Sequence, residues 1–229
     1  NLFFCGLYFV LSTNNRISHD DFYSIYIVEE LGVYKGVKLL YNQWCTRYIS
    51  LLISFFITSL LKYKITLIIY QLFIFAITSI STFLLLKNLK KHINNSLSKV
   101  QLINYSIFIC SAIFYCSFDI GQTWFWLSSN CTYLLSCIVL IYSLSKIINN
   151  NKSYLSYISI VFSGIIIGGS NGTLSFILLL FISCLFTLII INKNKIFGIQ
   201  LTPIRLKKWI TLYIATRISF IIMYLGNGN

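Results

Sequence analysis

The chain has 229 residues, of which 57% are hydrophobic and only 10% are charged, and its mean hydropathy is +0.80. Soluble domains normally carry about 25% charged residues, so this composition excludes an ordinary soluble enzyme. The net charge of +13 does not indicate a nucleic-acid partner, because the cations lie in short loops between apolar runs, which is the positive-inside pattern. The composition predicts a polytopic membrane protein whose lipid-facing backbone is helical.

Eight apolar runs approach the roughly 20 residues that cross a bilayer. They are Asn1–Thr13, Tyr48–Leu61, Ile65–Leu86, Leu102–Ser117, Cys131–Leu144, Tyr154–Gly168, Leu174–Ile191 and Trp209–Leu225. We expect an all-α transmembrane bundle with seven or eight spans, forming one domain over residues 1–229. The only methionine is Met223 and the first run begins at the first residue, so we expect a fragment of a longer protein that lacks both termini.

Three loops between these runs are basic: Lys87–Lys99, Lys146–Lys152 and Lys193–Lys208. If the intervening runs form hairpins, the three loops share one side, and the charge rule places that side in the cytoplasm. The loop around Asp119 then lies outside. Placing residues 14–45 outside as well requires an odd number of crossings over 48–86, where the pattern indicates two runs. Either one run is re-entrant or interfacial, or one loop lies on the other side.

Residues 14–45 form the first outer loop and hold four of the five acidic residues of the chain. Apolar positions at helical spacing predict one or two amphipathic helices in the membrane interface, with breaks at Gly32 and Gly36. Asp20 and Asp21 open this segment. Adjacent carboxylates raise one another's pKa, so keeping them together at a membrane surface indicates that the negative charge is used.

Several uses of the aspartate pair are open. The carboxylates could bind a divalent cation, accept a proton from an attacking hydroxyl, or pair with Arg16 or Arg47. The structural alternative is that Ser18, Asp20 or Asp21 caps the helix that follows.

Four stretches carry a resemblance to a known family. The first outer loop opens with "DDF" at Asp20–Phe22 and closes with "W..RY" at Trp44–Tyr48. Residues 118–135, "FDIGQTWFWLSSNCTYLL", place an acid before a pattern similar to "yW.sG..tY". The stretch "GGSNGT" at 168–173 is similar to a glycine and asparagine motif, and "LGNGN" at 225–229 resembles the start of an "APGN" motif. Together these motifs resemble a family of bacterial multi-pass membrane proteins of uncharacterised function, which is itself similar to the GT-C class of glycosyltransferases.

The resemblance implies a GT-C-like helical enzyme in the bacterial inner (plasma) membrane that uses a polyprenyl-phosphate-linked sugar at the outer face. A glycan or another molecule would be the acceptor. By position, Asp20 and Asp21 match the acid that is catalytic or binds a divalent cation such as Mg²⁺ or Mn²⁺ in that class. Arg47 and Arg217 would neutralise the donor phosphate. The other substrate-binding residues expected on these motifs are Trp44, Tyr48, Asp119, Trp124, Trp126, Asn171 and Asn229.

Some of these residues have competing interpretations. Trp124 and Trp126 could bind the faces of sugars or belong to an interfacial aromatic belt. Arg217 lies near the middle of an apolar run, where a cation usually faces a polar cavity or a partner. It could bind a lipid phosphate or pair with Asp119.

Two other functions are open. "GIIIGGSNGTL" at 164–174 could be a discontinuous helix of a transporter or flippase for a polar or lipid-linked solute. A non-catalytic membrane scaffold is the third interpretation.

Overall fold

A computed structural model describes residues 1–17, 20–61, 64–93, 97–191, 195–196, 199–200 and 202–226. The described chain is almost entirely helical, which confirms the expected all-α class. Its α-helices are α1 (Leu2–Thr13), α2 (Asp20–Gln43), α3 (Tyr48–Leu60), α4 (Lys64–Ile93), α5 (Lys99–Tyr115), α6 (Leu127–Ser129), α7 (Leu135–Ile148), α8 (Tyr154–Ser170), α9 (Gly172–Ile191) and α10 (Pro203–Tyr224). Two π-helical turns, η1 (Gly121–Phe125) and η2 (Asn130–Leu134), flank α6. Two short antiparallel strands, β1 (Lys195–Ile196) and β2 (Ile199–Gln200), precede α10.

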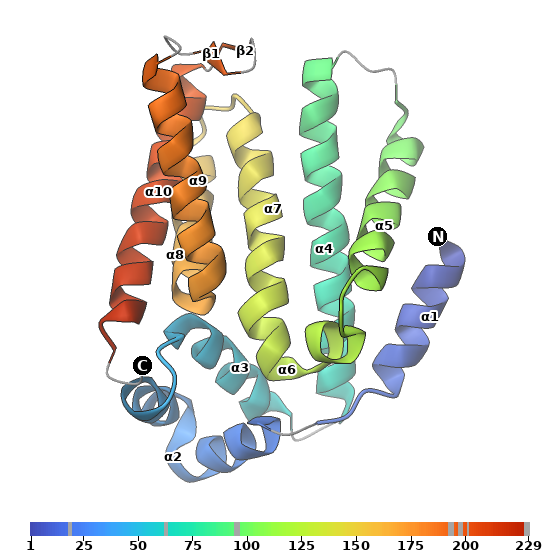
Figure 1. The fold of residues 1–229 in the computed structure, drawn as a ribbon. Helices are drawn as coiled ribbons and strands as arrows, with labels where there is room; N and C mark the ends of the chain where they lie inside the picture. Colours follow the sequence, from blue (N-terminus) through green and yellow to red (C-terminus); the bar gives the residue numbers. More distant parts are fainter. Residues whose placement is uncertain are drawn as a thin grey trace.

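The long helices α4, α5, α7, α8, α9 and α10 run lengthwise beside one another, whereas α2 and α3 lie across one end (Figure 1). We call the end with α2 and α3 the acidic end, because it holds all five acidic residues of the chain: Asp20, Asp21, Glu29, Glu30 and Asp119. The other end is the basic end. Its described cations are Lys87, Lys90, Lys91, Lys99, Lys146, Lys152, Arg205, Lys207 and Lys208.

Within the described residues, three helical runs are long and apolar enough to cross a membrane: Ile65–Lys91, Leu127–Ile148 and Gly172–Ile191. The second is longer than its expected counterpart, Cys131–Leu144, because α6, η2 and α7 form one continuous helical run. Four shorter apolar helices, Leu2–Thr13, Tyr48–Leu60, Lys99–Tyr115 and Tyr154–Ser170, accompany the three. The expected total of seven or eight spans would require shorter helices to cross as well.

Helix α3 shows which of the two apolar runs in residues 48–86 does not cross the bundle. Its 13 residues extend about 20 Å at helical rise, short of the roughly 30 Å hydrocarbon layer. It lies at the acidic end against α2, α6, η2 and α8, and α4 then starts from that same end. The run Tyr48–Leu61 is therefore the one that does not traverse the bundle, and the segments around Asp20 and Asp119 share one end.

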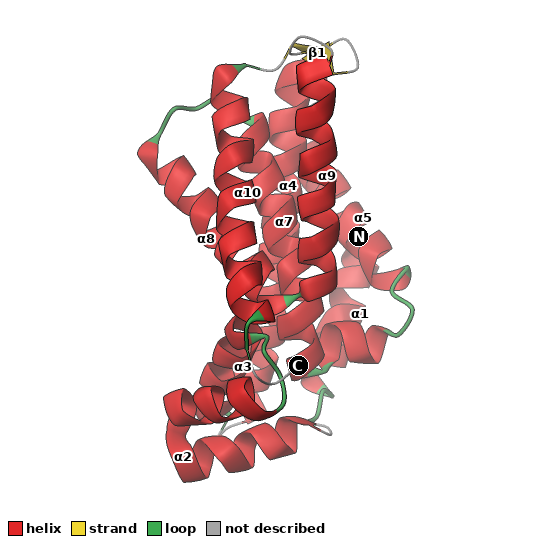
Figure 2. Cartoon of the chain, turned by 60° about the vertical axis from the view of Figure 1, so that its left-hand side comes forward, coloured by secondary structure: helices red, strands yellow, loops and turns green. Residues whose placement is uncertain are grey.

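Helix α2 is bent back on itself at Gly32, so its two halves lie beside each other below α3 (Figure 2). Gly32 has φ 75° and ψ 167°, a conformation that favours glycine, and the break expected there is confirmed. The break expected at Gly36 is wrong. Gly36 is buried inside the second half, where an added Cβ would lie 2.7 Å from Ile27 Cγ2 and 2.9 Å from Phe55. Its missing side chain allows close packing.

Helices α8 and α10 pack closely because small residues face each other. Gly164 and Gly168 lie one turn apart on α8, and a Cβ on Gly168 would be 2.6 Å from the carbonyl oxygen of Thr216. The Ser219 hydroxyl crosses the same interface and donates to the Ile165 carbonyl oxygen at 2.7 Å. Close approach through glycine and other small residues is the usual way in which helices associate within a bilayer.

We expect Gly168→Ala to lower the free energy of unfolding by about 1–3 kcal/mol, because the new methyl group would force the α10 backbone away. Gly6→Ala is the matched control. Gly6 is exposed on α1 and a Cβ there meets nothing within 4 Å, so alanine should raise the free energy of unfolding by up to about 1 kcal/mol through helix propensity. Thermal unfolding in detergent compares the two. Equal effects would contradict the packing described.

Candidate functional site

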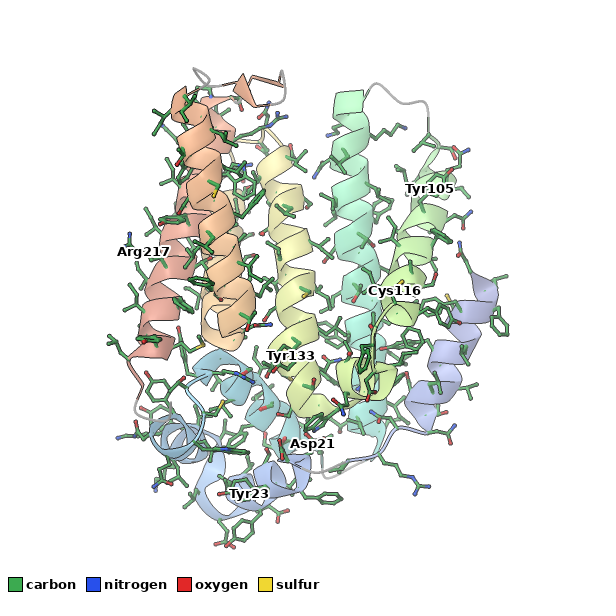
Figure 3. The ribbon with its side chains drawn as sticks, in the orientation of Figure 1. Asp21, Tyr23, Tyr105, Cys116, Tyr133 and Arg217 are labelled. Atoms are coloured by element: carbon green, nitrogen blue, oxygen red, sulfur yellow. The ribbon has the colours of Figure 1, made fainter. Side chains whose placement is uncertain are left out.

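Asp20 and Asp21 are adjacent in sequence but have different surroundings. Asp21 is only 3% exposed, and its Oδ1 accepts a hydrogen bond from the backbone N–H of Ser128 at 3.2 Å. Ser128 lies in the first turn of the helical run that begins at Leu127, where a carboxylate is favoured by the helix dipole. Asp21 therefore supports the start of a distant helix (Figure 3). This contact differs from the expected capping role, because the helix that Asp21 supports is not the one that follows it in sequence.

Asp20 instead lines a cavity of about 250 Å³ at the acidic end. Five parts of the chain meet around it: the first half of α2, the second half of α2, the segment before α3, α3 itself, and the α6–η2 region. The lining residues are Asp20, Ser24, Leu40, Trp44, Cys45, Arg47, Ser50, Leu51, Ser54, Ser128 and Thr132. We call this space the Asp20 cavity. Its lining has two charged side chains, the carboxylate of Asp20 and the guanidinium of Arg47.

Arg47 is held in place by an aromatic ring. It directly precedes α3, and its guanidinium carbon lies 5.6 Å from the centre of the Tyr133 ring, within range of a cation–π interaction. Tyr133 lies on η2, so this contact joins the end of the first outer loop to the Leu127–Ile148 run. The Asp20 cavity is therefore lined by a positive as well as a negative side chain.

The hydroxyl groups that line the cavity all donate their protons to nearby backbone carbonyls. Ser24, Ser50, Ser54 and Thr132 each donate to a carbonyl of their own helix, at 2.9, 2.9, 3.1 and 3.0 Å. A hydroxyl that has donated its proton still has lone pairs that can accept. These oxygens can therefore accept hydrogen bonds from the hydroxyls of a ligand.

Sequence reasoning missed these hydroxyl residues, although a pattern was present. On α3, buried Ser50, Ser54 and Thr58 recur every fourth residue within an otherwise apolar run. Such a spacing places polar groups on one face of a helix, here the face toward α2 and the cavity.

Two expected binding residues, Trp44 and Tyr48, lie at the edge of this region. Trp44 lines the cavity and is 54% exposed, with its ring 5.9 Å from that of Tyr23 in an edge-on arrangement. Tyr48 is absent from the lining. Its hydroxyl lies 2.6 Å from Ser219 Oγ, and its ring leaves no room for a Cβ on Gly169. Tyr48 therefore connects the start of α3 to α8 and α10.

A second pocket of about 390 Å³ surrounds Asp119. Its lining consists of Asn15, Arg16, Asp119, Gly121, Gln122, Phe125 and Trp126. Asp119 Oδ1 accepts a hydrogen bond from the Gln122 backbone N–H at 2.9 Å, and Asn15 Nδ2 donates to the Phe125 carbonyl oxygen at 3.0 Å. We call this the Asp119 pocket. It combines a carboxylate, a guanidinium, amides and two aromatic rings.

Trp124 does not belong to that pocket, contrary to expectation. Its side chain is fully buried, and its Nε1 donates to Ser117 Oγ at 3.1 Å. The ring packs against Tyr8 and Phe114, with centroid distances of 5.8 and 5.4 Å. Both interpretations of Trp124, as a sugar-binding ring and as part of an interfacial belt, were wrong, because η1 turns this residue into the core.

Asn130 is a further residue that sequence reasoning did not place. It is fully buried; its Oδ1 accepts from the Tyr70 hydroxyl at 2.7 Å and its Nδ2 donates to the Trp124 carbonyl oxygen at 2.9 Å. The side chain thus joins α4 to both π-helical turns. Such turns are often found at functional sites; here η1 contributes Gly121, Gln122 and Phe125 to the Asp119 pocket, and η2 contributes Thr132 to the Asp20 cavity.

Asn130→Ala should lower the free energy of unfolding by about 1–3 kcal/mol, because it leaves a buried hydroxyl and a buried carbonyl without this partner. Asn15→Ala is the comparison, since Asn15 donates to Phe125 from a partly exposed position and water can replace it. Chemical or thermal unfolding followed by far-ultraviolet circular dichroism measures both. The prediction fails if Asn130→Ala is no more harmful than Asn15→Ala.

The remaining expected site residues lie apart from both cavities. Asn171 is mostly buried and caps α9, because its Oδ1 accepts from the Leu174 backbone N–H at 3.0 Å. Arg217 lies on the exposed outer flank of α10 (Figure 3), so the structure does not bring it to Asp119 or into the Asp20 cavity. Asn229 lies outside the described residues.

The expected cation site was tested against the side chains present. Within the described part of the chain, no group of three or more His, Cys, Asp or Glu side chains is arranged to hold a metal ion. Divalent Mg²⁺ and Mn²⁺ prefer carboxylate and other oxygen ligands, and Asp21 directs one oxygen to a helix start rather than to the Asp20 cavity. Because Mg²⁺ is usually bound by one or two carboxylates together with substrate phosphates, a cation bound with the help of Asp20 stays an expectation.

Comparison of the chain with protein-family models, with curated proteins and with solved structures finds no match. A functional assignment therefore depends on the geometry of the acidic end.

Proposed function

We propose that this chain is the transmembrane catalytic region of a bacterial plasma-membrane glycosyltransferase with a GT-C-like architecture and seven or eight spans. It would transfer a sugar from a polyprenyl-phosphate donor to an acceptor at the outer face, with the acidic end outside. The observation that carries this proposal is the Asp20 cavity, whose lining includes both the carboxylate of Asp20 and the guanidinium of Arg47.

The cavity contains the groups that such a transfer requires. Arg47 would bind the donor phosphate, since a guanidinium matches phosphate in charge and shape. The serine and threonine oxygens would accept hydrogen bonds from the sugar hydroxyls. A volume of about 250 Å³ lies just below the roughly 300–1,000 Å³ of typical ligand pockets. It suits a sugar-phosphate head group, and the polyprenyl chain would remain in the bilayer.

In the proposed reaction an acceptor hydroxyl attacks the anomeric carbon of the donor. Asp20 takes the hydroxyl proton as general base. The new glycosidic bond forms as the bond between the anomeric carbon and the phosphate oxygen breaks. The electron pair leaves with polyprenyl phosphate, and the guanidinium of Arg47 stabilises its increased negative charge. This scheme assigns no step to a metal ion.

The Asp119 pocket is the proposed binding site for the acceptor. Its volume of about 390 Å³ lies within the range of ligand pockets, and it offers Trp126 and Phe125 as apolar faces for the C–H face of a sugar. Asp119 would accept hydrogen bonds from sugar hydroxyls, and the Gln122 side chain would donate hydrogen bonds to them. Both pockets are lined by residues next to the start of α2, Arg16 in the Asp119 pocket and Asp20 in the Asp20 cavity, so both belong to the acidic end.

The transporter alternative loses part of its support. The helix break at Asn171 is the turn between antiparallel helices α8 and α9, at the acidic end of the bundle (Figure 1), and is not a gap in the middle of one span.

The test uses the full-length protein in lipid vesicles containing a polyprenyl-phosphate donor with a radiolabelled sugar. Label should pass to an added acceptor with release of polyprenyl phosphate. Movement of label across the membrane without transfer would favour the transporter. If the label is neither transferred nor moved, the scaffold is favoured.

A further inference from the structure

The basic end has no acidic side chain of its own. All five acidic residues of the chain lie at the acidic end, so no carboxylate side chain of this protein can neutralise the lysines at the other end. Six of these lysines form what we call the basic rim: Lys87, Lys90, Lys91, Lys146, Lys152 and Lys207.

Contacts between helices hold the rim together. The Asn88 side-chain amide donates to the Ser145 carbonyl oxygen at 2.8 Å, which fixes the end of α4 against the end of α7. The next residue, Lys146, accepts at its carbonyl oxygen from the ammonium of Lys208 on α10 at 2.7 Å. Five of the six rim lysines therefore lie on three helices, α4, α7 and α10, whose ends are joined by these contacts, and Lys152 lies in the segment between α7 and α8.

Positive charges converge at this end in spite of their repulsion. Lys208 is fully buried, and its Nζ also donates to the Asn149 carbonyl oxygen at 2.5 Å. Burial lowers the pKa of its ammonium group, and the positive charges of Lys146 and Arg205 lower it further. Lys87 and Lys91 are exposed and one helical turn apart on α4, a spacing at which like charges destabilise a helix. An external anion would relieve this repulsion.

We propose that the basic rim is a binding surface for the phosphate-bearing head groups of anionic phospholipids, which stabilise this end of the bundle. The helices that carry Lys87, Lys91 and Lys146 include two runs apolar enough to span a membrane, Ile65–Lys91 and Leu127–Ile148. Their lysines therefore lie where a membrane-spanning helix reaches the head-group layer. Anionic lipids attract cations at such positions.

Titration of the full-length protein with short-chain phosphatidylglycerol and phosphatidylcholine, followed by native mass spectrometry, tests this surface. Wild type should bind phosphatidylglycerol more tightly than phosphatidylcholine. The double variant Lys87→Gln, Lys91→Gln should weaken phosphatidylglycerol binding by up to about thirtyfold, on the basis of about fivefold for each cation near an anionic surface. Arginine at both positions should restore it.

The matched control is Lys35→Gln with Lys38→Gln, which removes two exposed lysines from α2 at the acidic end and should leave the binding of phosphatidylglycerol unchanged. Equal affinity of wild type for the two lipids, or equal losses in both double variants, would overturn the proposal. So would inorganic phosphate alone, without lipid, if it raised the melting temperature as much as phosphatidylglycerol does. Neither readout depends on sugar transfer, so failure here leaves the proposed function intact.

Discussion

Asp20→Asn should lower the rate of sugar transfer by about 10²- to 10⁴-fold, the usual loss when a general base is removed. The amide has nearly the same shape as the carboxylate, and Asp20 lies at a partly exposed position lining the Asp20 cavity. The melting temperature of the variant should therefore stay close to that of wild type. Initial rates with saturating polyprenyl-phosphate donor, measured on the full-length protein, provide the readout.

Asp21→Asn is the matched control and should give the opposite pattern. The buried Asp21 carboxylate supports the helix start at Leu127–Ser128, and a charge in such a position contributes up to about 2 kcal/mol. The variant should lose stability of that order and keep most of its transfer rate. If Asp20→Asn is fully active while Asp21→Asn is inactive at full stability, the assignment of the two carboxylates is wrong.

Arg47→Gln should weaken donor binding by about 10- to 150-fold, which corresponds to the roughly 1.5–3 kcal/mol of a hydrogen bond to a charged group. The change removes the positive charge from the Asp20 cavity and the contact with the Tyr133 ring. Arg47→Lys should recover only part of the affinity, because an ammonium lacks the planar fork of a guanidinium. The dissociation constant for the donor is the measurement.

Lys38→Gln is the control for Arg47, since it removes an exposed positive charge from α2, outside the Asp20 cavity. If Lys38→Gln and Arg47→Gln weaken donor binding equally, the effect comes from the general surface charge, and the phosphate role of Arg47 is refuted.

The sequence was sufficient to predict the helical class and most helix positions, because long apolar runs have few alternatives in a membrane. It also predicted the turn at Gly32, since a break in an amphipathic pattern at glycine has a local cause. It could not separate Gly32 from Gly36. The role of Gly36 depends on Phe55, a residue far along the chain.

The site was predictable only as a region. Motif resemblance indicated both aspartates, but successive residues on a helix point about 100° apart, so only the packed structure separates Asp20 in the Asp20 cavity from Asp21 at a helix start. Trp124 and Trp126 are separated because Trp124 is buried within η1, whereas Trp126 follows η1 in an extended conformation. Arg217 looked anomalous in an apolar run, yet its helix places it on the outer flank of α10.

Photolabelling with a polyprenyl-phosphate donor that carries a diazirine on its sugar tests the central claim most directly, because it locates the bound head group without requiring turnover. Cross-links should map to the segments that line the Asp20 cavity, 20–24, 40–54 and 128–132. Unlabelled donor should prevent them, Asp20→Asn should retain them, and Arg47→Gln should reduce them. Competable cross-links located instead at the basic end, or on residues outside the Asp20 cavity, would contradict the account.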